Sequence, residues 1–497
     1  MTTPARATGP ALSPAETRDL EALNMRRLTA DSRAVKRGDT FVAYPGESRD
    51  GRQFIAQAIA AGAASVLWER RGFKWNPAWR VPNRALRDLR ARVGIIASRV
   101  YGNPSGRLRA IGITGTNGKP TCSQWIARAL NEHGVMTGVV GTLGYGLRGR
   151  LRPLINTTPD ALWLQAQLAD FARRGARAVS MEVSSIGLVQ GRVAGVAFDI
   201  AVLTNLTRDH LDYHRTMARY KEAKAKLFAA GSLRHAVLNL DDPFGVELAG
   251  TIRRRGLQVI GYGFDAPAGP VGRLPRVRGK NFANTPAGVR FDVSTPWGDA
   301  FVASRVLGRH NASNLLATLA VLLVCDIKLK DAVALLGRLD AVAGRMQRIG
   351  GGTRPLAVID YAHTPDALEN VLRALRDLTA GDLWCVFGCG GDRDRGKRPL
   401  MGRAAAQLAD RVIVTSDNPR FETPRTIISD IRRGVRGQCI IEPDRRRAIT
   451  AALRDARRGD VVLIAGKGHE PYQEIRGVRY PFSDVETARA ALRGART

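Results

Sequence analysis

The sequence predicts an α/β protein that is divided into about three domains. Its 497 residues are about three times the length of an ordinary domain. Short apolar runs alternate with helical patterns along most of the chain, which is typical of a mostly parallel sheet covered by helices. We therefore expect a small N-terminal α/β domain over residues 1–104, a larger central domain over 105–343, and a C-terminal α/β domain over 344–497.

The composition favours a globular protein of the cytoplasm. Apolar residues make up 44% of the chain, which is enough for several cores. No apolar run approaches the roughly 18 residues that a membrane span needs, so we expect no membrane insertion. The five cysteines form no C-x-x-C pair and are odd in number, which indicates reduced thiols and a cytoplasmic location rather than a disulfide framework or a zinc site.

The chain is unusually basic, with a net charge of +32 and 66 arginines against 11 lysines. Such an excess suggests a nucleic-acid binder, but the arginines are scattered through every segment and no RNA-binding or zinc-finger motif is present. Scattered solvated arginine is the favoured interpretation, without a specific nucleic-acid partner, and acidic substrates would fit the same bias. Four lysines, Lys119, Lys224, Lys397 and Lys467, lie inside motifs described below.

The first predicted domain reads as a strand, a turn, a second strand, a loop, an Ala-rich helix and another strand over residues 20–100. Residues 1–20 lack the apolar core of a signal peptide, and we expect a flexible polar tail there. The stretch 101–105, rich in Gly, Pro and Ser, marks the boundary to the next domain.

The central domain opens with the stretch RAIGITGTNGKPTCSQWIARAL over residues 109–130. A short apolar strand runs into a Gly-rich turn, followed by Lys119 and an amphipathic helix. Backbone N–H groups, the positive end of a helix and an ammonium together make a cradle for phosphate. The P-loop pattern G-x-x-x-x-G-K-[ST] is met imperfectly, because Pro120 stands where a hydroxyl residue is expected, and an ordinary strand–turn–helix remains the alternative.

Further strands of the central domain are expected at 178–181, 200–203 and 236–238, with an antiparallel hairpin near residues 289–306. A strongly apolar helix should follow over 308–325, capped by Asn311 or Ser313. This arrangement predicts a mostly parallel sheet of the P-loop type.

Four apolar runs in the C-terminal domain each end in polar residues, in the segments 356–365, 383–399, 411–420 and 460–472. Ligands of open α/β sheets bind beyond the carboxyl ends of the strands. The sequence therefore predicts a Rossmann-like domain with a ligand site at that edge.

The string TGTNGK over residues 114–119 resembles the ATP loop of the Mur ligases, which join amino acids to peptidoglycan precursors. Other segments resemble the same family from about residue 25 onward: DSR at 31–33, DGRQFI at 50–55, MEVSS at 181–185, DNPR at 417–420 and GKGHE at 466–470. The resemblance implies the three-domain Mur ligase architecture. It also implies an ATP-dependent ligase that adds meso-2,6-diaminopimelate to UDP-N-acetylmuramoyl-L-alanyl-D-glutamate through an acyl phosphate.

The resemblance assigns catalysis to Lys119, Glu182, His210 and Lys224. The last three would hold Mg²⁺, with Lys224 converted to a carbamate by carbon dioxide. Taken alone, His210 could equally be structural and Lys224 a lysine on a solvated helix face. Carbamylation needs the neutral amine, and Lys221 and Lys226 would lower the pKa of Lys224 if they lie close.

The resemblance also implies the residues that bind ATP and the precursor. Those for ATP are Gly115, Thr116, Asn117, Gly118, Lys119, Pro120, Thr121, Asn311, Asn314, Arg345 and Asp360. Those for the UDP-linked precursor are Ala30, Ser32, Glu47, Ser48, Arg49, Asn156, Thr157, Thr158, Ser184, Gln190 and Arg192. Plain turn chemistry is an equal alternative for residues 47–49.

The residues implied for diaminopimelate are Arg393, Asp417, Asn418, Pro419, Arg420, Gly466 and Glu470. Diaminopimelate carries a second carboxylate at its far end, and arginine offers that group a planar bidentate fork. Lysine lacks this carboxylate, so it is the runner-up amino acid.

Two positions depart from the family pattern. Pro120 replaces a threonine or serine, and it offers neither a hydroxyl nor an N–H group. Ile186 stands where the family usually has a histidine. A relative with impaired ATP activation that only binds the precursor is therefore a second hypothesis, and Thr121 could supply the missing hydroxyl if the turn shifts.

Overall fold

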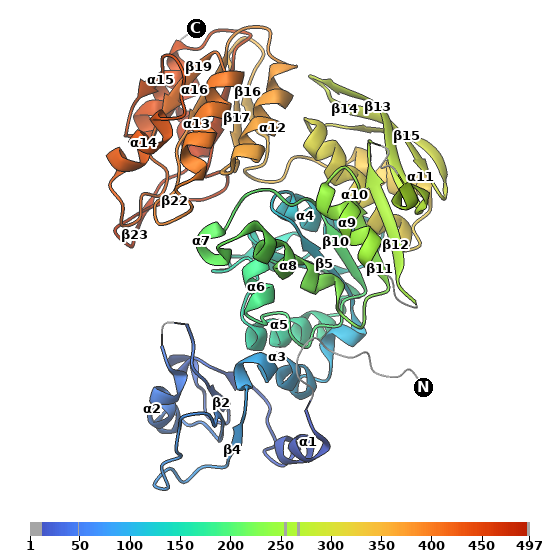
Figure 1. Cartoon of the computed structure of the whole chain (residues 1–497), viewed down its shortest axis with the longest axis vertical. Helices are drawn as coiled ribbons and strands as arrows, with labels where there is room; N and C mark the ends of the chain where they lie inside the picture. The colour runs from blue at the N-terminus through green and yellow to red at the C-terminus, as the bar shows by residue number, and fades with distance from the viewer. Residues whose placement is uncertain (1–11, 48, 253–255, 266–268, 495–497) are drawn as a thin grey trace.

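The computed structural model describes residues 12–47, 49–252, 256–265 and 269–494, and within them it contains three large β-sheets, one in each third of the chain. Figure 1 shows these units stacked along the long axis, with the central one between the other two. The four-stranded, eleven-stranded and six-stranded sheets lie in chain order, and a two-stranded ribbon completes the set of described sheets. The α/β class that the sequence predicts is confirmed.

The N-terminal unit is a parallel sheet flanked by helices. Its strands pair in chain order: β1 Leu28–Thr29, β2 Thr40–Ala43, β3 Ser65–Glu69 and β4 Asn83–Leu86. Its helices are α1 Pro14–Glu21, η1 Ser32–Ala34, η2 Gly51–Phe54, α2 Ile55–Ala60, α3 Leu89–Val100 and η3 Pro104–Arg107.

The expectation of a flexible tail over residues 1–20 is wrong for its described second half, because helix α1 lies there. Ser13 and Glu16 form a reciprocal capping box at the start of α1, which satisfies the free N–H groups of the first turn. The guanidinium of Arg92 then pairs with Glu16 at 2.6 Å, fixing α1 to α3. Residues 1–11 lie outside the described part.

The central sheet is parallel in its middle and antiparallel at both edges. Its order is β15-β14-β13-β12-β11-β10-β5-β9-β6-β7-β8. The strands are β5 Arg109–Thr114, β6 Thr137–Gly141, β7 Gly144–Leu147, β8 Arg150–Arg152, β9 Ala178–Glu182, β10 Ile200–Leu203, β11 His235–Asn239, β12 Gln258–Gly263, β13 Arg276–Thr285, β14 Gly288–Thr295 and β15 Gly298–Ser304. All four predicted parallel strands and the hairpin β14–β15 are confirmed.

Helices cover both faces of the central sheet. They are α4 Lys119–Glu132, α5 Ala161–Arg173, α6 Ser185–Val189, α7 Leu211–His214, α8 Met217–Phe228, α9 Pro243–Thr251, η4 Gly269–Arg273, α10 Arg309–Val324 and α11 Leu329–Gly337. The apolar helix α10 is present as predicted, but its cap is not: the helix starts two residues earlier than Asn311, with Gly308 at the cap position and no side-chain cap.

The C-terminal unit is a six-stranded sheet of order β16-β17-β21-β18-β19-β20, parallel except for β16. Its strands, with those of the ribbon, are β16 Gln347–Gly350, β17 Leu356–Asp360, β18 Leu383–Phe387, β19 Arg411–Val414, β20 Ile440–Ile441, β21 Val461–Ala465, β22 Tyr472–Ile475 and β23 Val478–Pro481. Its helices are α12 Pro365–Arg376, α13 Lys397–Leu408, α14 Pro424–Arg432, α15 Arg445–Asp455 and α16 Asp484–Gly494. All four predicted strands are confirmed.

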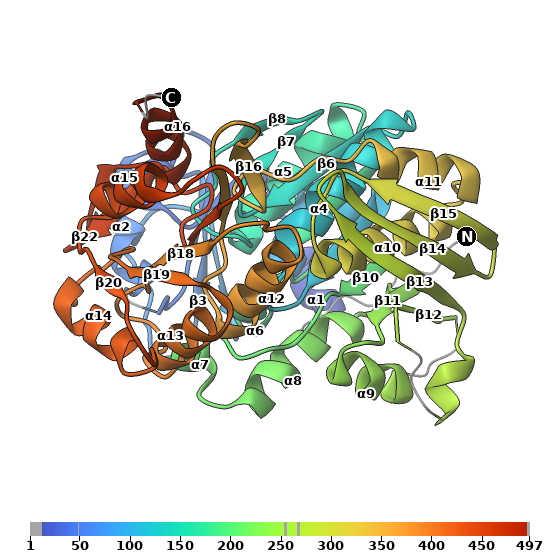
Figure 2. The ribbon, with the colours of Figure 1, turned by 90° about the horizontal axis from the view of Figure 1, so that it is seen from above.

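Packing places the C-terminal unit directly against the central one. Leu307, just before α10, belongs to the same buried cluster as the apolar face of α12, and the Asn284 side chain donates to the Ala374 carbonyl at 2.8 Å. Figure 2 shows α12 on the side of the C-terminal unit that faces α10. The ends of β5 and β9 therefore face the polar loops of the C-terminal sheet.

Candidate active site

The turn between β5 and α4 can be made only with glycine at two positions. Gly115 and Gly118 have φ angles of 150° and 85°, which favour glycine. A Cβ atom on Gly115 would lie 1.8 Å from the Thr204 hydroxyl, and one on Gly118 would lie 2.6 Å from Asn314 Oδ1. Within this narrow turn the N–H groups of Thr116 and Asn117 donate to Asn205, each at 2.9 Å, and helix α4 begins directly after Gly118.

Two lysines from different helices meet at this turn. Lys119 Nζ donates to the carbonyls of Gly115 at 2.7 Å and Thr116 at 2.8 Å. Lys224 Nζ, reaching from α8, donates to the same Gly115 carbonyl at 2.7 Å and lies 4.4 Å from the ring centre of Tyr220. The turn therefore brings the side chains of two lysines from different helices together at one backbone carbonyl.

Burial is the main cause that holds the pKa of Lys224 well below its usual range, and the charge of Lys119 adds to it. Burial also lowers the pKa of Lys119. The prediction that Lys221 and Lys226 lower the pKa of Lys224 is wrong, because Lys221 forms an ion pair with Glu247 on the exposed side of α8 and Lys226 lies on that exposed side too.

Polar contacts hold the remaining residues of the turn. The Thr116 hydroxyl donates to the Thr207 carbonyl at 3.1 Å. Asn117 N–H donates to Asn205 Oδ1 at 2.9 Å, and its side chain donates to Asp366 of the C-terminal unit at 3.1 Å. The predicted nucleotide turn thus already touches α12.

Pro120 lies in the first turn of α4 and is buried. Proline fits this position because the first N–H groups of a helix have no partner within it. The Pro120 carbonyl accepts a hydrogen bond from Ser123 at 3.1 Å. Thr121, the nearest hydroxyl residue, is buried one position further along.

Glu182 ends β9 and is fully buried beside the turn. Its two oxygens accept hydrogen bonds from the Thr142 N–H at 2.7 Å and the Thr142 hydroxyl at 2.9 Å. Burial raises the pKa of Glu182, and the nearby ammonium of Lys119 opposes this. The carboxylate is therefore held rigidly with a cationic neighbour, as a group that faces a phosphate and its cation would be.

His210 lies at the start of α7 with a φ angle of 53°, in the left-handed region that a non-glycine residue rarely adopts. Desolvation, with added repulsion from Lys119 and Lys224, lowers the pKa of His210 to about 3 although Asp209 opposes the shift. The imidazole is therefore neutral at pH 7 and able to accept a cation.

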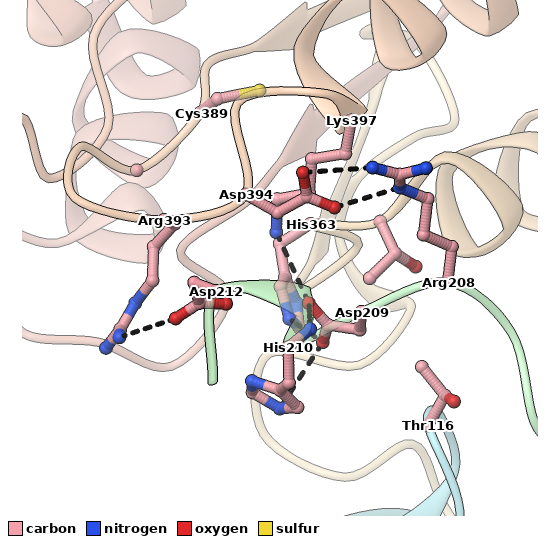
Figure 3. A network of polar contacts seen from close by, with 12 residues as sticks. Thr116, Arg208, Asp209, His210, Asp212, His363, Cys389, Arg393, Asp394 and Lys397 are labelled. Atoms are coloured by element: carbon pink, nitrogen blue, oxygen red, sulfur yellow. Dashed lines mark hydrogen bonds and ion pairs between the residues drawn. The ribbon is translucent and has the colours of Figure 1, made fainter. Parts of the chain in front are cut away.

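Asp209 is a buried centre of polar contacts that the sequence reasoning missed (Figure 3). Its Oδ2 atom lies 3.5 Å from His210 Nε2 and 3.4 Å from His363 Nε2, and its Oδ1 atom lies 3.6 Å from Lys397 Nζ. Burial alone would raise the pKa of Asp209, but the hydrogen bond from His363 and the positive charge of Lys397 help to hold it well below its usual range. Two features of the sequence could have indicated this network. Asp209 directly precedes His210 in the same motif, and Lys397 is one of only 11 lysines in the chain.

The residues expected around adenine lie where the central and C-terminal units meet. Asn311 and Asn314 are buried in the first turns of α10, 3.4 Å apart through their side chains. The Arg345 guanidinium lies 4.2 Å from the ring centre of Tyr361. Asp360 accepts hydrogen bonds from the N–H groups of Met346 and Ala362 at 2.7 Å, so it fixes the connection between the two units.

The residues expected around the precursor fall into two groups. In the central unit, the Thr158 hydroxyl donates to the Glu182 carbonyl, Arg192 donates to the Thr158 carbonyl at 2.8 Å, and Ser184 caps α6. Thr157 contacts Thr142 at 3.0 Å, and Asn156 is exposed beside it. These side chains surround the end of β9, next to Glu182.

The second precursor group lies in the N-terminal unit. The Ser32 hydroxyl donates to Gln57 at 2.9 Å, whereas Ala30 and Arg49 are exposed. Gln190 of the central unit donates to Glu47 across the gap between the units. Ser48 lies outside the described residues. Beside the second departure from the family pattern, Ile186, the Ser185 hydroxyl contacts His214 Nε2 at 2.9 Å.

The residues expected around the incoming amino acid converge at the carboxyl ends of β19 and β21. Asn418 accepts from Lys467 and donates to Glu470, at 2.9 and 2.8 Å. Gly466 has a φ angle of 115°, and a Cβ there would lie 2.4 Å from Asp417 Oδ2. Lys467, fully buried, was noted as a motif lysine but not assigned to the site.

Two arginines flank this cluster. Arg420, after Pro419, donates to the Gly391 carbonyl at 2.7 Å and lies 3.8 Å from Glu474. Its guanidinium is therefore not in direct hydrogen-bond contact with that carboxylate. Arg393 is half exposed and lies 3.7 Å from Asp212 of the central unit. Positive groups thus face the crevice from the C-terminal side.

Within the described residues, no group of three or more His, Cys, Asp and Glu side chains is arranged to hold a metal ion. In the same part of the chain, no helix combines the length and the apolar character needed to cross a membrane.

Three domain profiles of one family match the chain. They are the Mur ligase family catalytic domain over residues 24–101, the Mur ligase middle domain over 113–322, and the Mur ligase glutamate ligase domain over 344–468.

Curated relatives and solved structures agree with these profiles. The UDP-N-acetylmuramoyl-L-alanyl-D-glutamate–2,6-diaminopimelate ligase of Nitrosomonas europaea is 50% identical, with 95% of this chain and 93% of the relative covered. The ligase of the same name from Pseudomonas aeruginosa is 51% identical, with 95% of each covered. A solved structure of a ligase with that name is 40% identical with a TM-score of 0.68, covering 94% of this chain and 95% of its own.

A more distant solved structure, MurF from Acinetobacter baumannii, is 18% identical with a TM-score of 0.66 over 93% of this chain and 96% of its own, which shows the shared fold alone. The domain profiles, the identity over nearly the whole chain and the three-unit architecture lead to one conclusion: the chain belongs to the Mur ligase family.

Proposed function

We propose that this chain is an ATP-dependent ligase of the cytoplasm that adds meso-2,6-diaminopimelate to UDP-N-acetylmuramoyl-L-alanyl-D-glutamate. Curated relatives with about 50% identity carry the name of this ligase. The observation that carries the proposal is the meeting of Lys119 and Lys224 at the Gly115 carbonyl, beside the buried Glu182.

The reaction needs a carboxylate to be activated before an amine can attack it. The free carboxylate of the precursor attacks the γ-phosphorus of ATP, so that ADP leaves and an acyl phosphate forms. The amine then attacks the acyl carbon, phosphate leaves, and the amine loses a proton. Lys119 and the positive start of helix α4 bind and orient the phosphates, because charge in surroundings poor in water acts more strongly than in bulk solvent.

The donor set fits Mg²⁺ when Lys224 is included. Magnesium prefers oxygen ligands, which Glu182 supplies and which a carbamate on Lys224 would add, while His210 offers a neutral nitrogen. Bound magnesium would neutralise the charge between the two anions that must meet. A depressed pKa favours the neutral amine of Lys224 that carbamylation requires, and a carbamate signal from ¹³C-bicarbonate that disappears in K224R would support this modification.

Arg420 supports diaminopimelate rather than lysine as the incoming amino acid. Its side chain is about one-fifth exposed at the mouth of the Asp417–Glu470 cluster. A second carboxylate on the substrate would pair with the guanidinium nitrogens of Arg420 directly, whereas lysine would leave Arg420 with only the more distant carboxylate of Glu474, 3.8 Å away. Sites built to bind a polar group reject analogues that lack the group far more strongly than apolar pockets do.

The direct test is ADP release by the purified protein with the dipeptide precursor, magnesium and bicarbonate. We expect ADP release that depends on diaminopimelate, with kcat/KM for lysine lower by about 100-fold or more. Equal use of lysine would contradict the amino-acid assignment. Precursor binding without any ADP release would instead support the alternative in which Pro120 has disabled ATP activation.

A further inference from the structure

Two loops with complementary charges face each other between the central and C-terminal units (Figure 3). We call them the interdomain seam, formed by residues 208–212 and 393–397. Three ion pairs cross it: Arg208–Asp394 at 2.9 Å, Asp209–Lys397 at 3.6 Å and Asp212–Arg393 at 3.7 Å. Each unit contributes positive and negative side chains to the seam. The ion pairs therefore fix how the two loops align with each other as well as how closely they come together.

The three pairs differ in their access to water. In the Asp212–Arg393 pair both side chains are partly exposed, 31% and 51%, whereas both members of the Asp209–Lys397 pair are buried, 7% and 6% exposed. The Arg208–Asp394 pair is mixed, with Arg208 44% and Asp394 8% exposed. Exposed ion pairs contribute little to stability because water screens them. Removing one partner of a buried pair costs much more, since the other charge stays behind without compensation.

Asp209 also contacts a histidine from each unit. Its Oδ1 atom accepts the His210 N–H at 2.9 Å, and its Oδ2 atom faces the rings of His210 and His363. His363 is itself fixed, because its Nδ1 atom contacts the Tyr361 carbonyl at 2.9 Å. One carboxylate thus contacts His210 and, at the same time, two groups that move with the C-terminal unit.

We propose that Asp209 is a positioning residue that couples docking of the C-terminal unit to the orientation of His210. When the unit is docked, Lys397 and His363 hold the carboxylate in place, and the carboxylate holds the His210 ring. When the unit moves away, Asp209 loses both external partners and the constraint on His210 relaxes. The effect on turnover rests on the proposed ligase function, whereas the effect on docking does not.

The first test measures docking without reference to activity. The variants are D209N, which keeps the shape of the side chain but removes its charge, and D212N as the matched control in the partly exposed Asp212–Arg393 pair of the same seam. We expect small-angle X-ray scattering to give a larger radius of gyration for D209N and an unchanged one for D212N. We expect K397M in the D209N background to restore part of the docking, because the ammonium left without its partner is removed.

The second test measures turnover of the same variants. We expect kcat for ADP release to fall about 10-fold or more in D209N and to stay within about twofold in D212N, with KM for the amino acid less affected than kcat. If D209N proves unstable in thermal unfolding, K397M alone should show the same larger radius and lower kcat. Wild-type docking in D209N and K397M, or equal effects of D209N and D212N, would overturn the proposal. Absence of ADP release in the wild-type protein, with docking changed in D209N, would count against the ligase function alone.

Discussion

At the scale of single residues, burial gives the candidate site its chemistry. Lys221 and Lys226 flank Lys224 in helix α8, and the sequence suggested that these neighbours would lower its pKa if they lie close. In the structure the fully buried side chain instead reaches the turn after β5, where desolvation and Lys119 act on it. The lowered pKa therefore has a different physical cause from the one that the sequence suggested, because burial cannot be read from spacing along one helix.

Pro120 provides the sharpest residue-scale prediction. We expect P120T to raise kcat/KM for Mg-ATP, because threonine restores an N–H group and a hydroxyl at the turn. A charge-assisted hydrogen bond of about 1.5–3 kcal/mol corresponds to an increase of about 10-fold or more. Steady-state ADP release at varied ATP concentration would measure it.

The matched control for that change is P424T at the start of α14, which also has proline in its first turn. P424T should leave kcat/KM for ATP unchanged. An unchanged value in P120T as well would show that the turn does not need the hydroxyl residue.

At the scale of elements, helix α4 has a left-handed glycine at each end, and the two have different surroundings. Gly118 and Gly134 have φ angles of 85° and 84°, but only Gly118 faces a close neighbour, Asn314. Alanine in the left-handed region costs roughly 1–2 kcal/mol at either position. The two sites therefore separate backbone strain from the crowding at the turn.

We expect both G118A and G134A to lower the melting temperature, and only G118A to raise KM for ATP markedly, because its methyl group would displace Asn314 or the turn. Thermal unfolding and ADP-release kinetics on the two variants would measure this. Equal ATP kinetics in both variants would contradict the assignment of the turn.

His310, in the first turn of α10, predicts a dependence of stability on pH. Burial lowers its pKa to about 4, and its Nδ1 atom is buried without a hydrogen-bond partner. Between pH 6.5 and 4 the unfolded chain binds a proton at this residue and the folded chain does not. Protonation therefore favours unfolding, and this contribution to stability is lost as the pH falls through that range.

We expect the melting temperature of H310N to fall less than that of the wild type when the pH is lowered from 7.5 to 5. H133N, at an exposed histidine that ends α4, should lose as much as the wild type. The same loss in all three proteins would show that His310 titrates normally in the folded state.

At the scale of the whole molecule, the sequence predicted the class, the order of the sheets and most of the strands that end at the crevice. These strands are short apolar runs bounded by polar turns, so local pattern suffices to find them. The interdomain contacts could not be predicted in this way. Asp209 pairs with Lys397, which is 188 positions away, and only the docking of two separate sheets brings them together.

The local sequence pattern also failed to predict the helix near the N-terminus, which is stabilised by tertiary contacts. Helix α1 was assigned to a polar tail, since its residues are charged and short of apolar periodicity. Its stability comes from the capping box of Ser13 and Glu16 and from the Arg92 pair on α3, and the second of these depends on a residue about 75 positions further along the chain.

The central claim is that one crevice joins ATP-driven activation at the Lys119 turn to selection of the amino acid by Arg420. The most direct measurement is the ratio of kcat/KM for diaminopimelate to that for lysine in the wild type and in R420M, with KM for ATP determined alongside. We predict a ratio of about 100 or more in the wild type, a fall toward one in R420M, and an unchanged KM for ATP. A wild-type ratio near one, or a ratio that R420M leaves unchanged, would contradict the account.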